Sequence, residues 1–313
     1  MIYSKPALLY NEQADLLISR GLIADRVLLI ERLKAVNYYR LSGYLHTFRI
    51  IDTDGQRLDL YLPGTNFTTV WRRYVFDRQL RLLVLDGIER VEIAMKTRLT
   101  HDFCRRYGAF GYLESQNLPR LAPLQHADFL RRVADETLRS REDFIKHFSS
   151  KYGDSHEYLP LWMAVEIMSY GSVLTLFHGM AESELKQVAA GFGLKLPLLD
   201  SWITTLNYIR NICAHHGRLW NRELGIKPKI PFKDQYPDWH TPIPTPADRI
   251  FSVLTILRYF LSQIAPQSKW QDRLERLLSE YSEIPLEFMG FPKNWKGHAV
   301  WKFNVSVNEK DAE

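Results

Sequence analysis

The stretch WITTLNYIRNICAHHGRLWNR, residues 202–222, carries a helical pattern around which the rest of the chain can be arranged. Neither glycine nor proline interrupts it before Gly217. Its apolar residues recur at steps of three and four, with His216 at the one missing step: Trp202, Leu206, Ile209, Cys213 and Trp220. The spacing predicts a single helix over residues 202–222 with one buried face.

A second face of the same predicted helix is polar. Its members follow one another at steps of three and four: Asn207, Asn211, His215, Arg218 and Arg222. Amides, an imidazole and two guanidinium groups on one side of a helix indicate a surface that binds or reacts with a ligand. We expect Arg218 and Arg222 to contact the phosphate groups of that ligand.

Arg210 flanks this polar face and forms the pattern R-x4-H with His215. The looser R-x5-H occurs four times in the chain, so spacing alone is weak evidence, but R-x4-H occurs once and Asn211 follows the arginine directly. A histidine can move a proton near neutral pH, and an arginine offers a fixed positive charge. This division of roles suits cleavage of RNA by its own 2′-hydroxyl group, with Arg210 stabilising charge on the phosphate.

The run RNICAHHGRLWNR, residues 210–222, resembles the Arg-His motif of the HEPN ribonuclease superfamily, in the form seen in the bacterial Abi (abortive infection, AbiD/AbiF-like) phage-resistance proteins. Three further runs are similar to Abi-family blocks and follow in the expected order: NYYRLSGY at 37–44, FDRQLRLLVLDGIERVEIAMK at 76–96 and PLWMAVEIMSYGSVLTLF at 160–177. The resemblance covers most of the chain, and its most specific parts are the YYRLSGY and RNICAHH runs.

This resemblance implies a metal-independent endoribonuclease, an RNase toxin of anti-phage abortive infection, with catalytic roles for Arg210 and His215. Asn211 matches the polar position after the arginine in that motif. His216 would either replace His215 in proton transfer or orient its imidazole. RNA is the implied partner, no cofactor is implied, and an antitoxin or a regulatory RNA could restrain the activity. A non-catalytic RNA-binding or protein-interaction module on the same helical fold stays open as the alternative.

Five residues apart on one straight helix, Arg210 and His215 would lie about 140° apart in projection and would not aim at one phosphate. The reach of arginine and a loosened helix end near Gly217 could close that gap within one subunit, but a twofold axis beside the helix would bring a second arginine and histidine to the same cleft without distortion. HEPN proteins typically pair in this way, which the resemblance adds to the geometry. We therefore expect a homodimer.

A zinc site is the competing interpretation of Cys213, His215 and His216, three possible ligands within four residues. Adjacent histidines on a helix point about 100° apart, and the cysteine belongs to the apolar face, so they would not converge on an unbroken helix. The sequence contains neither a Walker G-x-x-x-x-G-K-[ST] loop nor a G-x-G-x-x-G run. We expect neither a metal nor a nucleotide cofactor.

The composition, 46% hydrophobic and 25% charged residues, is that of a globular protein. No apolar run approaches the roughly 20 residues that span a bilayer, and the N-terminus lacks the pattern of a signal peptide. The two cysteines, Cys104 and Cys213, lie inside helical patterns, where reduced, buried thiols are expected. These features predict a cytoplasmic protein without a membrane partner.

The net charge of +5 is unevenly distributed. Residues 1–150 hold 23 Lys+Arg against 18 Asp+Glu, whereas residues 151–313 hold 18 of each. Part of this excess lies on the outer faces of a long helix predicted over residues 66–106, whose apolar stripe includes a possible bend at Gly87. A solvated surface is one interpretation of this charge. The other is RNA binding by Arg72, Arg73, Arg78 and Arg81.

The remaining patterns predict a mainly all-α fold, a HEPN-like helical bundle. We expect two N-terminal helices capped by Asn11 and Asp25, a hairpin or loop near 50–63, one helix over 125–149, and a proline-rich loop near 227–246. The expected domains are 1–64 with the YYRLSGY block, 65–284 with the Arg-His motif, and a packed tail at 285–313. Glu166, alone in an apolar run, could support Arg210 or His215, or form a salt bridge elsewhere.

Overall fold

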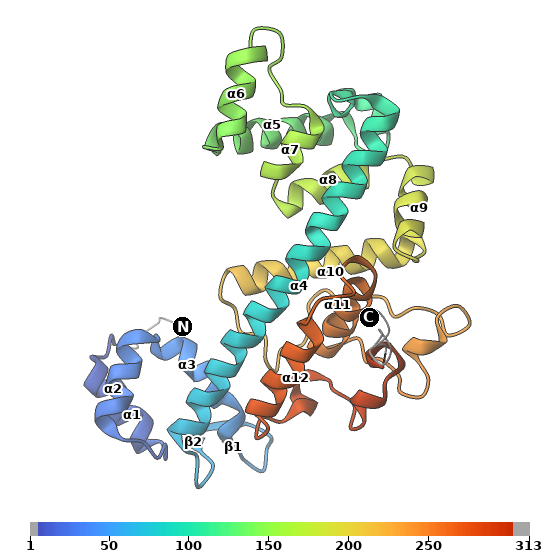
Figure 1. Ribbon diagram of the computed structural model, residues 1–313. Coiled ribbons are helices and arrows are strands. Elements are labelled where there is room, and N and C mark those ends of the chain that lie inside the picture. Colours follow the sequence, from blue (N-terminus) through green and yellow to red (C-terminus); the bar gives the residue numbers. More distant parts are fainter. Residues whose placement is uncertain (1–5, 303–313) are drawn as a thin grey trace, which may run out of the picture. The chain divides into compact units, whose positions relative to one another are not determined.

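The computed structural model describes residues 6–302, and within this range the chain forms twelve α-helices and one two-stranded hairpin (Figure 1). The prediction of a mainly helical protein is confirmed. The chain divides into two compact units, one of Met1–Leu82 with Arg273–Pro285 and one of Leu83–Asp272 with Leu286–Glu313. The predicted domain boundaries at 64 and 284 stay a prediction.

The first unit begins with two short helices, α1 (Tyr10–Ser19) and α2 (Arg26–Ala35), which pack on each other. Gly21 follows α1 with φ +97°, a left-handed conformation that glycine adopts without steric cost. Asp25 caps α2 as predicted, because its side chain accepts a hydrogen bond from the amide of Leu28 at 2.8 Å. The predicted start at Asn11 is wrong: α1 begins after Leu9, whose amide bonds the Glu12 carboxylate instead.

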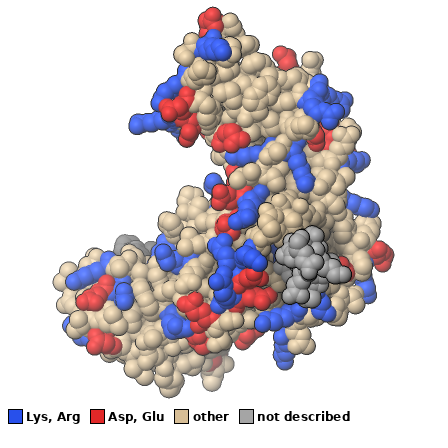
Figure 2. All heavy atoms as spheres, in the orientation of Figure 1, with Lys and Arg blue, Asp and Glu red and all other residues tan. Residues whose placement is uncertain are grey.

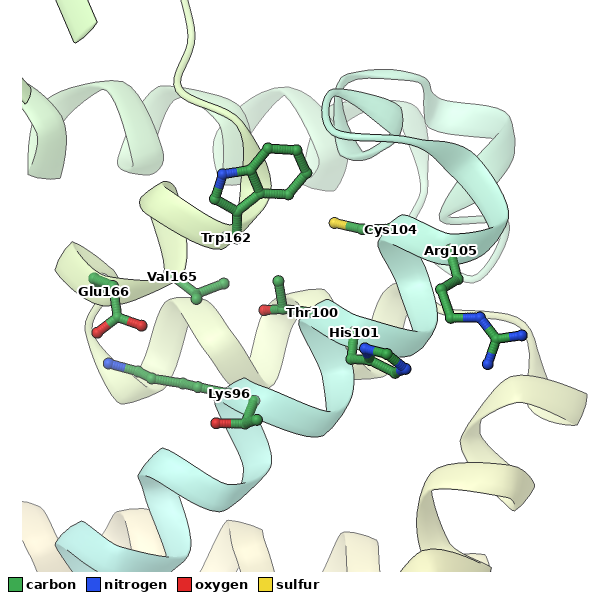
Figure 3. A pocket seen from close by; sticks show the side chains of 9 residues that line it. Lys96, Thr100, His101, Cys104, Arg105, Trp162, Val165 and Glu166 are labelled. Atoms are coloured by element: carbon green, nitrogen blue, oxygen red, sulfur yellow. The ribbon is translucent and has the colours of Figure 1, made fainter.

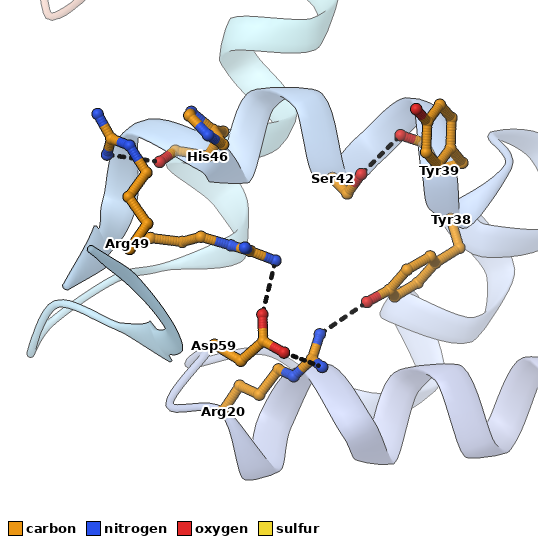
Figure 4. A network of polar contacts seen from close by, with 8 residues as sticks. Arg20, Tyr38, Tyr39, Ser42, His46, Arg49 and Asp59 are labelled. Atoms are coloured by element: carbon orange, nitrogen blue, oxygen red, sulfur yellow. Dashed lines mark hydrogen bonds and ion pairs between the residues drawn. The ribbon is translucent and has the colours of Figure 1, made fainter. Parts of the chain in front are cut away.

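The YYRLSGY run forms helix α3 (Tyr38–Leu45). Tyr44 is buried, and its hydroxyl donates to the fully buried carboxylate of Asp77 at 2.5 Å. The hydroxyl of Tyr38 accepts a hydrogen bond from Arg20, which also pairs with Asp59 (Figure 4). Two tyrosines of the run therefore tie α3 to the rest of the first unit.

A short antiparallel hairpin follows, with strands β1 (Arg49–Ile51) and β2 (Arg57–Tyr61). Arg49 pairs with Asp59 at 3.0 Å across the two strands. Gly55 takes φ +77° in the turn. Of the hairpin or loop predicted near residues 50–63, the structure forms the hairpin.

Helix α4 (Phe67–Tyr107) matches the long helix predicted over residues 66–106. Its apolar stripe is buried: Leu80, Val84, Ile88, Val91, Met95, Leu99 and Phe103. At Gly87, proposed from the sequence as a possible bend, a Cβ would lie 3.1 Å from the indole nitrogen of Trp270. That indole donates to the carbonyl of Leu83 at 2.8 Å, so Gly87 provides room for a close helix contact.

The single helix predicted over residues 125–149 is wrong, because the segment forms α5 (Pro123–Arg139) and α6 (Asp143–Tyr152). Ser140 has an extended backbone with ψ 143°, and its hydroxyl accepts from the amide of Glu142 at 3.4 Å. Such local side-chain bonds compete with helix continuation. Three helices follow: α7 (Leu161–Ile167), which starts directly after Pro160, α8 (Tyr170–Gly179) and α9 (Glu182–Gly191).

The second unit is completed by α10 (Leu196–Ala214), α11 (Ile250–Ile264) and part of α12 (Trp270–Glu280). Between α10 and α11 the proline-rich segment contains one short 3₁₀ turn, Pro237–Trp239. The aromatic residues Phe291, Trp295 and Trp301 of the following tail are buried, and the Trp301 indole donates to Thr255 of α11 at 3.1 Å. The tail as a separate domain at 285–313 stays a prediction. None of the helices in the described range has both the length and the hydropathy required to cross a bilayer.

Candidate active site at the end of helix α10

Helix α10 buries the apolar face predicted from the sequence, with Trp202, Leu206, Ile209 and Cys213 all at most 2% exposed. The helix begins earlier than the quoted stretch, at Leu196 with a proline in its first turn. It ends at Ala214, so the prediction of one helix through Arg222 is wrong. Trp220 is buried, but in the turn that follows rather than on the helix.

The end of α10 is a Schellman motif, a pair of backbone hydrogen bonds that closes a helix around one left-handed residue. The amide of His216 donates to the carbonyl of Cys213 at 3.0 Å, and the amide of Gly217 donates to the carbonyl of Ile212 at 2.7 Å. His216 is the left-handed residue, with φ +57°. At Gly217 a Cβ would lie 3.0 Å from the side chain of Ile212, so the close contact favours glycine there.

After this motif the chain folds back along α10 in the opposite direction. The amide of Gly225 donates to the hydroxyl of Tyr208 at 3.2 Å, and nearer the helix start the indole of Trp202 donates to the carbonyl of Lys229 at 2.8 Å. The amide of Lys229 in turn donates to the hydroxyl of Ser201 at 2.9 Å. These bonds along the length of α10 fix where the helix ends relative to the returning segment.

The four predicted catalytic residues lie together in the last turn of α10 and its cap. Arg210 is half-buried, whereas Asn211, His215 and His216 are exposed. The side chains of Arg210, Asn211 and His215 make no hydrogen bond or ion pair with any residue between 6 and 302. The only bond of His215 in this range is the amide bond to the carbonyl of Asn211 at 3.0 Å, which continues the helical pattern into the cap.

Cys213 lies apart from the histidines, because its side chain is buried on the apolar face while both imidazoles are exposed. Arg218 and Arg222, predicted on the polar face of the helix, lie in the turn after it, where the Nε of Arg222 donates to the carbonyl of Arg218 at 2.6 Å. The continuous polar stripe predicted from the sequence is therefore interrupted after His215.

Two of the four arginines of α4 that were predicted to bind RNA are buried. Arg73 donates to the hydroxyl of Thr47 at 2.7 Å and lies over the ring of Phe48. Burial lowers the pKa of Arg73 below its ordinary value. Arg81 pairs with the buried carboxylate of Asp77, four residues before it. These contacts favour a structural role for both guanidinium groups.

The other two arginines differ from each other. Arg72 bonds the carboxylate of Glu283 at 2.5 Å and lies over the ring of Tyr281. Arg78 is exposed, and its side chain has no hydrogen bond or ion pair within the described part of the chain. On the face drawn in Figure 2, basic and acidic side chains are interspersed rather than separated into large areas of one sign. Arg78 is therefore the member of the predicted set with a guanidinium group available to a ligand.

Glu166 is exposed on α7, and its side chain makes no hydrogen bond or ion pair with Arg210, His215 or any other described residue. It lines a groove between α4 and α7, where it points toward Lys96 (Figure 3). Sequence reasoning missed this groove, because its two walls lie about 60 residues apart in the chain. The available signal was Trp162 together with Glu166, one turn apart in an otherwise apolar run.

A family model described as Abi-like protein matches residues 31–221. This range extends from α2 through the turn after α10 and includes Arg210, Asn211, His215 and His216. No curated protein and no solved structure matches the chain.

Proposed function

Because the chain belongs to the Abi-like protein family, we propose that it acts in bacterial abortive infection against phage and does so by cleaving RNA with Arg210 and His215. The family match supports the defence role. The ribonuclease chemistry rests on the residues at the end of α10 and on their similarity to the Arg-His motif of HEPN ribonucleases.

The observation that carries this proposal is the state of Arg210. The residue is half-buried, and its guanidinium group has no carboxylate or carbonyl partner among residues 6–302, so its donors are available to an anion. An imidazole without a protein partner lies in the adjoining helix cap, at His215. An anionic group such as a phosphate would supply the missing partner of Arg210.

The reaction follows from what these two side chains can do. His215 accepts the proton of the ribose 2′-hydroxyl, and the 2′ oxygen attacks the adjacent phosphorus. Arg210 donates hydrogen bonds to the non-bridging oxygens as negative charge grows there. The bond from phosphorus to the 5′ oxygen breaks, and the leaving oxygen takes a proton from a protonated histidine or from water. The products carry a 2′,3′-cyclic phosphate and a 5′-hydroxyl.

The experiment is to incubate the purified protein with total RNA in EDTA and to map the ends of the fragments. We expect cleavage to continue, because the proposed steps use a proton acceptor and a fixed positive charge. The fragments should end in 2′,3′-cyclic phosphate, and a strand with a single deoxyribose 5′ to the cleaved bond should resist. Binding of RNA with no cleavage under these conditions would instead favour a non-catalytic RNA-binding module.

We also propose that the active species is a homodimer. Arg210 and His215 lie five residues apart, which places them about 140° apart around the helix axis, and a second copy would bring both residue types to one phosphate. The test is a mixed dimer, isolated by two tags, of a wild-type chain and an R210A/H215A chain. A shared cleft predicts activity well below half that of the wild-type dimer, whereas half the activity or a fully active monomer would contradict it.

A further inference from the structure

A groove lies between α4 and α7, away from the Arg-His motif, since none of its lining residues belongs to α10 (Figure 3). Its volume is about 520 Å³, within the range of roughly 300 to 1,000 Å³ that is usual for small-molecule sites. Both polar and apolar side chains line the groove: Lys96, Thr97, Thr100, His101, Cys104, Arg105, Trp162, Val165 and Glu166.

The two walls follow from helical spacing. On α4, Lys96, Thr100 and Cys104 recur every four residues and face the groove. On α7, Trp162, Val165 and Glu166 share one face. Figure 3 shows the Trp162 indole over the Cys104 end of the groove and the Glu166 carboxylate at the Lys96 end. The groove thus has an aromatic end and a carboxylate end.

Trp162 is 51% exposed, although its neighbour Val165 is buried. A large aromatic ring that lines a groove and remains exposed offers a flat surface on which another ring can stack. A ligand ring stacked on Trp162 would also contact the apolar side chain of Val165, which lies on the same side of the groove.

Several polar groups along the groove have no protein partner. Thr100 is 8% exposed, and its hydroxyl makes no hydrogen bond within the described part of the chain. Glu166, His101 and Arg105 are exposed, and their side chains likewise make no hydrogen bond or ion pair between residues 6 and 302. Lys96 differs, because it bonds the carbonyl of Met168 at 3.1 Å and pairs with Glu92 at 3.2 Å. The exposed side chains of Glu166, His101 and Arg105 therefore offer an acceptor and donors to a ligand in the groove.

We propose that this groove binds a guanine nucleotide, with the base stacked on Trp162. An ionised carboxylate can only accept hydrogen bonds, so Glu166 selects a base that presents two adjacent N–H donors. The guanine edge does so with N1–H and the N2 amino group, whereas the adenine edge presents one donor group beside an acceptor. Arg105 and His101, on the α4 rim, are the groups that receive the phosphate. This site is additional to the proposed RNA cleavage and does not depend on it.

The test is isothermal titration calorimetry of the full chain with GMP and AMP. We expect saturable binding of GMP at least about tenfold tighter than binding of AMP, a difference of about 1.4 kcal/mol. Glu166→Gln should remove most of that preference, and Trp162→Leu should weaken both nucleotides. Arg105→Gln should weaken GMP while leaving guanosine nearly unchanged. The matched controls are Glu157→Gln and Phe232→Leu, both exposed and outside the groove.

The trinucleotides CGC and CAC, compared in the same way, distinguish a free nucleotide from a guanosine within RNA. Tighter binding of CGC than of GMP supports the groove as an RNA subsite, and tighter binding of GMP supports a free nucleotide. No saturable GMP binding by folded protein, equal affinity for GMP and AMP, or GMP binding unchanged by both Glu166→Gln and Trp162→Leu would overturn the proposal.

Discussion

The amide of Gly217 donates a hydrogen bond to the carbonyl of Ile212 at 2.7 Å, and this bond closes α10 immediately after the residues of the candidate site. It leaves His215 at the cap, with an exposed imidazole. It also requires His216 to adopt a left-handed backbone, φ +57°, at a position where glycine is most common.

The strain at His216 can be measured by comparing His216→Gly with His216→Ala. Both substitutions remove the imidazole and its contacts, so the difference between them reports the backbone. We expect the glycine variant to be more stable by about 1 kcal/mol, since a left-handed conformation costs an L-residue roughly 1 to 2 kcal/mol. The melting temperature would differ by about 1 to 2 °C. Equal melting temperatures would show that the residue is not held in this conformation in solution.

Much of the fold could be predicted from the sequence, because long amphipathic patterns dominate it. The apolar stripe of α4 has seven members at helical spacing, from Leu80 to Phe103, and all are buried as expected. The end of α10 was missed because the apolar repeat continues past it through His216 and Trp220. Trp220 is buried by the turn that follows the helix, and a periodicity count cannot distinguish the two cases.

The candidate site is proposed from sequence alone, and it stays a prediction. Arg210 and His215 could be proposed as a pair because they lie close together in the sequence. The burial of Arg73 could not be predicted, since its partner Thr47 is 26 residues away in a different element. For Arg81 a signal existed in Asp77, four residues earlier on the same helix, but such pairs are also common on exposed helix faces.

His298 predicts a pH dependence of stability. Its imidazole is fully buried, and the amide of Val300 donates to its Nδ1 at 3.2 Å, so its Nε2 donates to Thr245 at 2.8 Å. Burial lowers the pKa of His298 from 6.5 to about 4, with a small opposing effect of Asp238. The unfolded chain therefore takes up a proton near pH 6.5 that the folded chain does not, and stability is lost as the pH falls toward 4.

The measurement is the free energy of unfolding of wild type and of His298→Gln between pH 7.5 and pH 4. We expect the difference between the two proteins to shrink below pH 6.5 by up to about 1.4 kcal/mol per pH unit, about 3 kcal/mol in all. Parallel curves would show that His298 is protonated equally in the folded and unfolded chain.

Arg78 and Arg73, five residues apart on α4, should respond differently to substitution. Arg78→Glu should weaken RNA binding several-fold at fixed salt without changing the melting temperature, because its guanidinium group is exposed and has no partner in the described range. Arg73→Ala should lower the melting temperature instead, through loss of its contacts with Thr47 and Phe48. The matched control for net charge is Arg139→Glu, exposed at the end of α5. An equal loss of RNA affinity in Arg78→Glu and Arg139→Glu would contradict a specific role for Arg78.

The central claim is that Arg210 and His215 cleave RNA, and its most direct test uses a second arginine–histidine pair as the control. Arg141 and His147 are both exposed and are spaced nearly as closely as Arg210 and His215. His147 lies in α6, and Arg141 lies just before it. The measurement is the single-turnover rate of RNA cleavage by four purified variants, R210A, H215A, R141A and H147A, with RNA affinity and melting temperature determined for each. We expect R210A and H215A to lose about 10² to 10⁴ in rate with nearly unchanged melting temperature, and H215A to retain RNA affinity. R141A and H147A should cleave like wild type. Wild-type rates in folded R210A or H215A would contradict the assignment of these residues as the catalytic pair.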